Sequence, residues 1–201
     1  MTKKSLLNSL KIQKRVVYAL LMREIITRYG RNNIGFLWLI LEPMIFTLLF
    51  TVMWTIRDMD HVSKLPITIF VLTGYGTMLL WRNTIGRSLS AISSNIGLMY
   101  HKNVKPMDIF IARAILEILG TIAAFILIYI IFLWFGLVDQ PKDIFKIIGG
   151  FFFLVWFAFF GSILIGSLSN LSDIVQKIWS PFSLILMLIS GTFFMVEWLP
   201  S

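Results

Sequence analysis

The stretch LILEPMIFTLL, residues 39–49, places a carboxylate, Glu42, directly before a helix-breaking proline, Pro43, inside an apolar run. In a soluble protein this pair marks a turn between two helices, because proline disfavours the α region for the residue before it. In a membrane-spanning helix the pair is costly, since Pro43 has no donor and leaves the carbonyl of Leu39 without its helical partner. The composition of the chain decides between the two settings.

The composition is that of an integral membrane protein. Of the 201 residues, 58% are hydrophobic and 14% are charged, against about 45–50% and about 25% in soluble domains. The absence of cysteine excludes disulfides and thiolate metal sites. The net charge of +8 matters mainly through its distribution along the chain, and we expect no nucleic-acid partner.

Hydropathy predicts an all-α, polytopic membrane helical bundle, because each span needs about 20 apolar residues. The five predicted transmembrane spans are 34–56, 66–81, 109–138, 144–169 and 178–196. The second is short and contains glycine. Glu42 is the ninth residue of the first span, about 12 Å in from Ile34. A carboxylate at that depth is expected to face the bundle or to be functional.

The distribution of Lys and Arg predicts the orientation of the chain. On one side, the segment before the first span carries eight, the interval from Arg82 to Arg113 carries five, and the fourth connection carries Lys177. That makes 14 on this side, against 4 on the other: Arg57, Lys64, Lys142 and Lys146. The positive-inside rule therefore places the N-terminus in the cytoplasm. Five spans leave Ser201 outside.

Residues 1–33 are predicted to be a cytoplasmic amphipathic segment lying in the membrane interface, ahead of a transmembrane domain at 34–201. One helical face is apolar, with Tyr18, Met22, Ile25, Ile26 and Tyr29. The opposite arc, expected to face anionic headgroups, holds Arg23, Glu24, Thr27, Arg28 and Arg31. A solvated basic tail is the alternative.

The connection 82–108 is also predicted to contain an amphipathic helix on the cytoplasmic side. Its apolar residues recur at i, i+4, i+7, i+11 and i+14: Ile85, Leu89, Ile92, Ile96 and Met99. Such a helix either docks on a partner or lies on the membrane as a plain connector. These two alternatives stay open on the residue pattern.

Catalytic and metal-binding motifs are missing from the sequence. It contains no GxxxxGK[ST] phosphate-binding loop. The two histidines, His61 and His101, fall on opposite predicted sides of the membrane, so we expect no metal site. We therefore expect a protein that is not an enzyme and that holds no cofactor itself.

Two further features of the spans carry polar or aromatic groups. Arg113 and Glu117 are four residues apart on the third span and are predicted to form an ion pair, either functional or simply at headgroup level. The fourth span contains FFFLVWFAFF, residues 151–160. Aromatic faces can stack on sugar rings, but lipid contact and helix packing are alternatives. The candidate conduit or gating residues are Trp38, Glu42, Pro43, Phe151, Phe152 and Trp156.

Two stretches together resemble a known family. LMREIITRYGRNNIGFLWLILEPMIF, residues 21–46, contains G-x-L-W followed by L-E-P. YHKNVKPMDIFIARAILE, residues 100–117, contains V-K-P-x-D-x-x-x-A-R-x-x-L-E. The chain resembles the membrane subunit of ABC-2 type polysaccharide exporters, closest to the capsular polysaccharide (KpsM-type) permeases. Relative to that family, the chain is expected to lack the C-terminal re-entrant helices and sixth span.

The resemblance implies a permease that works as a homodimer with a separate ATP-binding subunit, on which ATP and Mg²⁺ are bound. It implies export of a lipid-linked capsular polysaccharide across the inner membrane of a Gram-negative cell, with possible periplasmic or outer-membrane export partners. The 82–108 connection would be the coupling loop. The candidate contacts with the ATPase are Arg87, Asn95, Lys102, Lys105 and Asp108. An ABC-2 permease for a lipid or drug and a membrane-embedded glycan-modifying protein are the alternatives.

Overall fold

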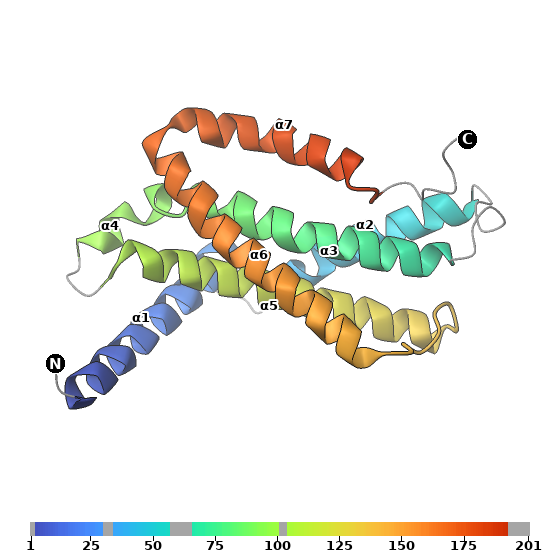
Figure 1. The fold of residues 1–201 in the computed structure, drawn as a ribbon, viewed down its shortest axis with the longest axis horizontal. Coiled ribbons are helices and arrows are strands. Elements are labelled where there is room, and N and C mark those ends of the chain that lie inside the picture. The colour runs from blue at the N-terminus through green and yellow to red at the C-terminus, as the bar shows by residue number, and fades with distance from the viewer. Residues whose placement is uncertain (1–2, 30–33, 57–65, 101–103, 193–201) are drawn as a thin grey trace.

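The computed structural model describes residues 3–29, 34–56, 66–100 and 104–192. Every regular element within these ranges is a helix, which confirms the all-α class (Figure 1). The elements are α1 (Lys3–Tyr29), α2 (Ile34–Ile56), α3 (Ile67–Ser88), η2 (Ser93–Asn95, a 3-10 helix), α4 (Ile96–Met99), α5 (Pro106–Trp134), α6 (Ile144–Leu171) and α7 (Asp173–Ile189).

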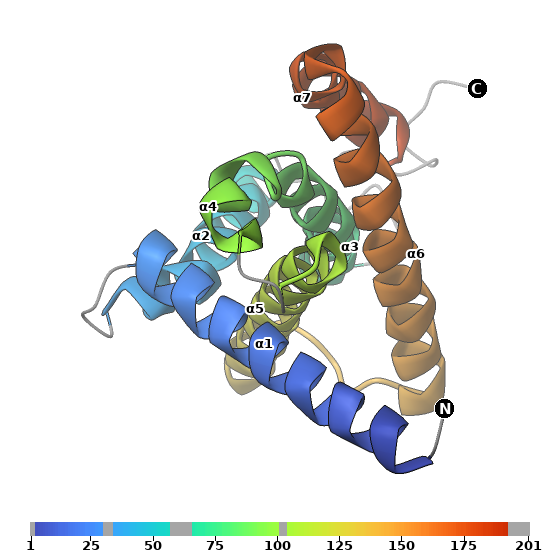
Figure 2. The ribbon, with the colours of Figure 1, turned by 90° about the vertical axis from the view of Figure 1, so that its left-hand side faces the viewer.

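Helix α3 is the centre of the bundle, and it packs against α2, α5, α6 and α7 (Figure 2). At its middle, Leu80 is fully buried among Ala114 and Ile118 of α5 and Ala158 of α6. Alanine at two of these contacts lets the helix backbones approach closely, as in other membrane bundles. The core is therefore built where α3, α5 and α6 meet.

Helix α6 buries one narrow stripe of small side chains against α3 and α5: Ala158, Ser162, Gly166 and Ser169. A Cβ added to Gly166 would lie 2.5 Å from Phe110 Cε1 and 2.9 Å from Ser88 Oγ. Ser162 and Gly166, four residues apart, form a pair of small residues that lets α6 approach its neighbours closely.

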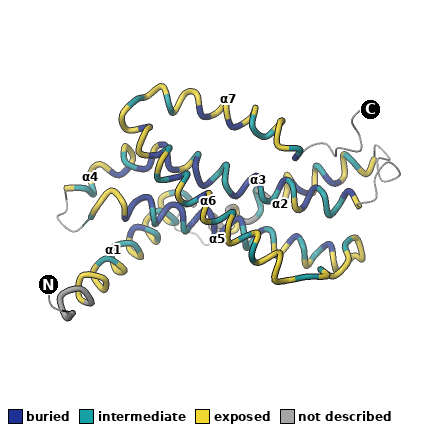
Figure 3. Tube along the Cα trace, in the orientation of Figure 1, coloured by how far each residue is buried: buried dark blue, intermediate teal, exposed yellow. Residues whose placement is uncertain are grey.

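Much of the remaining surface of α6 is exposed (Figure 3), and most of its exposed side chains are large and apolar. Within the described residues, α5 and α6 are long and apolar enough to cross a membrane, and a shorter apolar stretch, Met44–Ile56, belongs to α2. Exposed aromatic residues such as Phe145 and Phe153 would be a liability in water but are suited to contact with lipid.

The first predicted span coincides with α2, and the other predicted spans differ from the observed helices at one or both ends. Helix α2 matches the predicted first span and stays helical through Glu42 and Pro43, although the side chain of Pro43 is not among those described. Helix α3 continues seven residues beyond Trp81 to Ser88, because Arg82 and Arg87 do not end the helix and find partners beside it.

The third span ends earlier than predicted, at Trp134 rather than at Val138. Gly136 adopts a left-handed conformation with φ 68°, and the Leu137 amide donates to the Phe132 carbonyl at 2.9 Å. This is a glycine C-cap, which hydropathy alone does not detect.

Helices α6 and α7 are joined by a single extended residue, Ser172, with φ −152° and ψ 124°. Its side chain accepts a hydrogen bond from the Ile174 amide and caps α7. The fourth and fifth predicted spans are thus connected by one residue rather than by the expected 170–177 loop. The predicted end of the fifth span, up to Val196, lies outside the described residues.

The prediction of one amphipathic helix in the 82–108 connection is wrong, because the structure contains several short elements there. Its first part continues α3, residues 89–92 form turns, and η2 and α4 follow. Serine and asparagine side chains compete with helical hydrogen bonding here: Ser94 Oγ donates to the Ser90 carbonyl at 2.6 Å and Asn95 Nδ2 to the Ala91 carbonyl at 2.9 Å.

Helix α1 lies across α5 (Figure 2). The face that it turns towards the protein differs from the predicted one. Leu20 is buried against Ala91, Ile109, Phe110 and Ala112. Tyr18, Met22 and Ile26 from the predicted apolar face are exposed, so they are available to the membrane interface. The predicted outward arc is wrong for Glu24 and Arg28, because both point into the protein to pair with charges on α5. Arg31 lies outside the described residues.

The close packing along the stripe of small residues on α6 predicts that adding a side chain there lowers stability. Gly166→Val should lower the stability of the detergent-solubilised protein by about 1–3 kcal/mol, because Phe110 and Ser88 leave no room for a Cβ. Gly150→Val on the same helix is the matched control, since its Cβ meets nothing within 4 Å. Thermal unfolding of the two variants compares them, and equal melting temperatures would contradict the packing described here.

Candidate functional site

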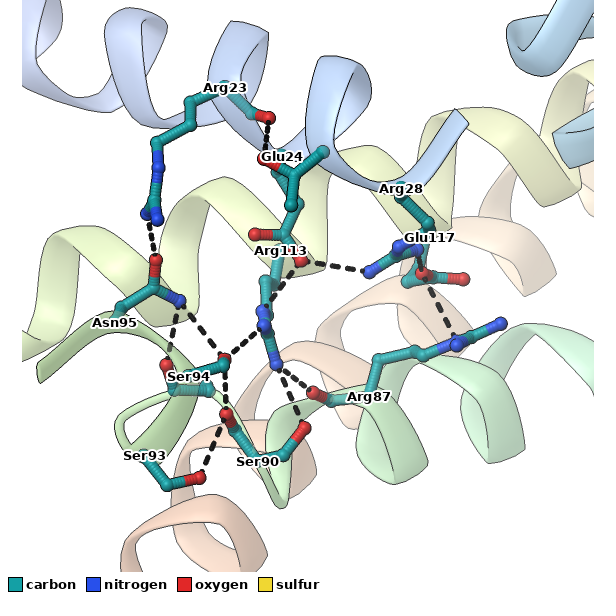
Figure 4. Close-up of polar contacts among 12 residues, drawn as sticks. Arg23, Glu24, Arg28, Arg87, Ser90, Ser93, Ser94, Asn95, Arg113 and Glu117 are labelled. Atoms are coloured by element: carbon teal, nitrogen blue, oxygen red, sulfur yellow. Dashed lines mark hydrogen bonds and ion pairs between the residues drawn. The ribbon is translucent and has the colours of Figure 1, made fainter. Parts of the chain in front are cut away.

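A cluster of charged side chains joins α1, α3 and α5 (Figure 4). Arg28 of α1 pairs with Glu24 at 3.1 Å and also with Glu117 of α5. Arg87 Nε of α3 lies 3.7 Å from the same oxygen of Glu117. Arg113 Nε of α5 lies 2.9 Å from Glu24 Oε1, an ion pair without the alignment of a hydrogen bond. These five residues form the ionic cluster.

The ionic cluster is largely buried except at Arg87, whose side chain is half-exposed, and its charges nearly balance. Glu117 is only 3% exposed, and two carboxylates face three guanidinium groups. A buried charge costs several kcal/mol unless it is paired and hydrogen-bonded. Because Arg113 and Glu117 lie one turn apart on α5, they face the same side. The cluster therefore sets the rotation of α5 relative to α1 and α3.

Arg113 also holds the turn that follows α3 (Figure 4). Its guanidinium donates to the Arg87 carbonyl at 2.8 Å, to Ser90 Oγ at 3.2 Å and to Ser94 Oγ at 2.6 Å. One side chain of α5 thus connects the ionic cluster to the segment leading into η2.

The same segment is held from α1. Arg23 donates to Asn95 Oδ1, and Gln13 donates to the carboxylate of Asp108 at the start of α5. Asp108 also accepts from the Lys105 amide at 3.0 Å, which caps α5. Helix α1 therefore contacts both ends of the connection between α3 and α5.

Arg113 and Glu117, which were predicted to pair with each other, form their described ion pairs with residues of other helices. The structure places both residues in the ionic cluster, but the described ion pairs run from Arg113 to Glu24 and from Glu117 to Arg28 and Arg87. The spacing on α5 identified two members of the site. Their partners come from helices that the spacing could not place.

The residues predicted to contact an ATPase differ in their exposure to solvent. Arg87 is half-exposed and Lys105 is exposed. Asn95 and Asp108 are buried and bonded within the chain, so their side chains are not presented to a partner in this conformation. Lys102 lies outside the described residues. The exposed tip of this region is instead apolar, with Ile96 and Tyr100.

A second feature is a cavity of about 330 Å³ between α2, α3 and α7, here called the polar cavity. Its lining combines three aromatic rings with charged and amide groups: Glu42, Phe46, Phe50, Tyr75, Leu79, Arg82, Asn83 and Met187. The ring of Tyr75 lies 5.0 Å from that of Phe50 and 6.5 Å from that of Phe46, between centroids. Hydrogen-bonding groups and aromatic faces thus meet inside an apolar bundle.

Arg82 also lines a smaller neighbouring hollow of about 210 Å³, here called the arginine pocket. Its lining comes from α3 and α7: Arg82, Asn83, Gly86, Arg87, Trp179, Ser180 and Ser183. Arg82 Nε donates to Ser183 Oγ at 3.3 Å. Arg87 belongs to both the arginine pocket and the ionic cluster, so the two features share a wall.

The structure separates the predicted conduit residues. Glu42 lines the polar cavity, whereas the ring of Phe151 packs at 4.8 Å against that of Phe125. The remaining described candidates are exposed on the outside of the single chain: Trp38, Phe152 and Trp156. Aromatic residues as dense as those in 151–160 cover every side of a helix, so they cannot all face one cavity.

Sequence reasoning missed Arg82 as a cavity residue and Glu24 and Arg28 as members of a buried cluster. Hydropathy places Arg82 just beyond the second predicted span, although an arginine adjoining an apolar helix often faces the bundle interior. Glu24 and Arg28 carried the signal of an i, i+4 pair. In the described ranges, no three His, Cys, Asp or Glu side chains gather as a metal site requires.

Comparison with known proteins supports one family. Residues 15–201 match the sequence model of the ABC-2 type transporter family. The chain is 44% identical over 193 residues to the capsule polysaccharide export inner-membrane protein BexB of Haemophilus influenzae, covering 96% of this chain and 73% of that protein. It is 46% identical over 198 residues to the capsule polysaccharide export inner-membrane protein CtrC of Neisseria meningitidis serogroup A, covering 98% and 75%.

A more distant relative is the polysialic acid transport protein KpsM of Escherichia coli, which is 37% identical over 120 residues, or 60% of this chain and 46% of that protein. The family match spans the polar cavity, the whole ionic cluster and all of α5, α6 and α7. The chain therefore belongs to the ABC-2 type transporter family, as a transport component of the membrane rather than an enzyme.

Proposed function

We propose that this chain is the inner-membrane permease subunit of an ATP-driven exporter that moves a lipid-linked capsular polysaccharide. Two relatives, at 44% and 46% identity, are named as capsule polysaccharide export proteins, which supports a capsular polysaccharide as the substrate over a drug. The observation that carries the proposal is the polar cavity, because it brings sugar-binding chemistry inside a bundle whose outer surface is apolar.

The lining of the polar cavity fits a glycan in transit. Phe46, Phe50 and Tyr75 offer ring faces to the apolar faces of sugars, and Glu42, Arg82 and Asn83 offer hydrogen bonds to hydroxyl groups. A cavity of about 330 Å³ holds only a short segment of a chain. The polysaccharide would therefore pass by successive contacts with a few sugar units at a time.

The membership of the ABC-2 family implies an ATP-binding partner subunit. We infer that the exposed tip formed by η2, α4 and Tyr100 docks on it, since Ile96 and Tyr100 are apolar and exposed. The tip is tied to α5 through Arg113 and to α1 through Arg23. Motion of the tip would therefore be passed to the ionic cluster and to α3.

The wider assembly follows the same proposal. The chain would work as a homodimer, with five membrane spans built from α2, α3, α5, α6 and the segment beginning with α7. Residues 1–33 would lie in the cytoplasmic interface before a transmembrane domain at 34–201, and 82–108 would be the coupling loop. Export partners in the periplasm or outer membrane would receive the polysaccharide.

Replacing Glu42 tests the polar cavity. Glu42→Gln keeps the shape but removes the charge, so membrane insertion should persist while export falls about tenfold, as expected for the loss of one charge-assisted hydrogen bond. The measurement is surface polysaccharide in a permease-deficient strain supplied with the variant and its ATPase. Phe153→Leu, an exposed position on α6, is the control and should export normally. Unchanged export in Glu42→Gln would rule out a role for this carboxylate in transport.

Crosslinking tests the docking tip, and the absence of native cysteine makes single-cysteine variants simple. Ile96→Cys should crosslink to the ATP-binding subunit, with a yield that changes when nucleotide binds. Leu137→Cys, equally accessible beyond the other end of α5, should not. Equal yields at the two positions would refute docking through the tip.

Removing one charge from the ionic cluster should lower the stability of the protein strongly. Glu117→Gln leaves Arg28 and Arg87 without their shared carboxylate and should cost about 3 kcal/mol of stability or more. The control is Asp143→Asn, which alters an exposed pair with Lys146 at 3.3 Å and should cost less than about 1 kcal/mol. Thermal unfolding in detergent compares the two, and a similar loss in both would mean that the cluster contributes no more than a surface pair.

A further inference from the structure

An apolar groove of about 600 Å³ opens on the outside of the bundle between α3, α6 and α7. Its lining consists of aromatic and aliphatic side chains and one glycine: Trp81, Ile85, Trp156, Phe157, Phe160, Gly161, Leu164, Ile165, Trp179, Phe182 and Leu186. Its volume lies within the range of about 300–1,000 Å³ that is usual for ligand sites. Such a groove suits hydrocarbon chains.

Trp179 connects the apolar groove to the arginine pocket, because its side chain lines both. It is buried between the two, with its ring 6.2 Å from that of Trp81 in an edge-on arrangement. Gly86 lets the two helices approach here, since a Cβ at that position would lie 3.3 Å from Trp179 Nε1. A hydrocarbon site and a cationic site therefore adjoin each other across one side chain.

The arginine pocket is suited to an anion. Its described lining contains two guanidinium groups and no carboxylate. Arg82 donates to a neutral hydroxyl, Ser183 Oγ, and the ion pair of Arg87 with Glu117 is long at 3.7 Å and half-exposed. Guanidinium groups bind phosphate through paired hydrogen bonds, and basic pockets between membrane helices bind lipid headgroups.

We propose that the apolar groove and the arginine pocket together hold the lipid end of the transported glycolipid, with its acyl chains in the groove and a phosphate on Arg82 and Arg87. The inference rests on the proposed function, because Arg82 also lines the polar cavity in which we place the glycan. The three hollows follow one another through shared residues, first Trp179 and then Arg82. This order matches that of lipid, phosphate and sugar in such a molecule.

Photolabelling tests the proposal on the full chain with its ATP-binding subunit in lipid nanodiscs. The probe is a phosphatidylglycerol with a diazirine near the end of one acyl chain. Labelled peptides should map to residues 156–165 and 179–186. A diacylglycerol with the same diazirine chain lacks the phosphate, and it should label the groove about tenfold less, as expected when charge-assisted hydrogen bonds are missing.

Two variants separate the groove from general contact with lipid. Leu164→Trp should fill the groove and abolish its labelling, whereas Leu119→Trp on α5 should not, since the two leucines are 59% and 60% exposed and only Leu164 lines the groove. Arg82→Gln should reduce labelling by phosphatidylglycerol to the level of the diacylglycerol probe. Equal labelling by both probes, or labelling that survives Leu164→Trp, would overturn the proposal.

Competition decides which lipid occupies the site. Lipids extracted from capsule-producing cells should compete with the probe better than an equal amount from a capsule-deficient strain. Equal competition would assign the site to ordinary phospholipid, and disulfide crosslinking of Leu164→Cys between two copies would assign the groove to a protein interface; either result overturns the proposal. Labelling needs no export, so intact labelling with failure of the Glu42→Gln export test would count against the proposed function alone.

Discussion

The pairing of the buried carboxylates of Glu24 and Glu117 is the constraint on which the arrangement of α1, α3 and α5 depends. Neither charge can stay inside the bundle without guanidinium partners, and those partners come from all three helices. An apolar interface tolerates sliding and rotation of its helices, because one hydrocarbon contact replaces another. A fixed set of charges does not, so the cluster gives these helices one register.

Helix α3 brings the functional features together because its two sides differ. One side is apolar and packs into the core with α5 and α6, and the other carries Arg82 and Asn83 towards α2 and α7. Arg87, one turn further on, reaches both Glu117 and the arginine pocket. A change in the turn after α3 can therefore reach the polar cavity through this one helix.

The sequence predicts most of the helices but few of the contacts between them. Long apolar runs identify α2, α5 and α6 closely, because the requirement for about 20 apolar residues is strong and local. The end of α5 depends on the backbone conformation of Gly136, and the extension of α3 depends on partners for Arg82 and Arg87, neither of which hydropathy records. The outward arc predicted for α1 was wrong at Glu24 and Arg28 because periodicity identifies a polar face without revealing what faces it. Glu42 was correctly expected to face the bundle, since a carboxylate deep in a span has few other places to lie.

The single residue between α6 and α7 limits how the bundle can widen. With only Ser172 outside the two helices, the direction in which α7 leaves α6 is set mainly by one pair of backbone torsions. Gln176, near the start of α7, donates to the Leu89 carbonyl just beyond α3, and Ser183, past the middle of α7, accepts a hydrogen bond from Arg82 of α3. Just beyond the C-terminal end of α7, Thr192 is buried, and its carbonyl oxygen would lie 3.7 Å from a Cβ added to Gly74 of α3, so this end of α7 is also packed against α3. Widening the polar cavity beside Met187 therefore requires a change in the Ser172 torsions together with the loss of these contacts with α3.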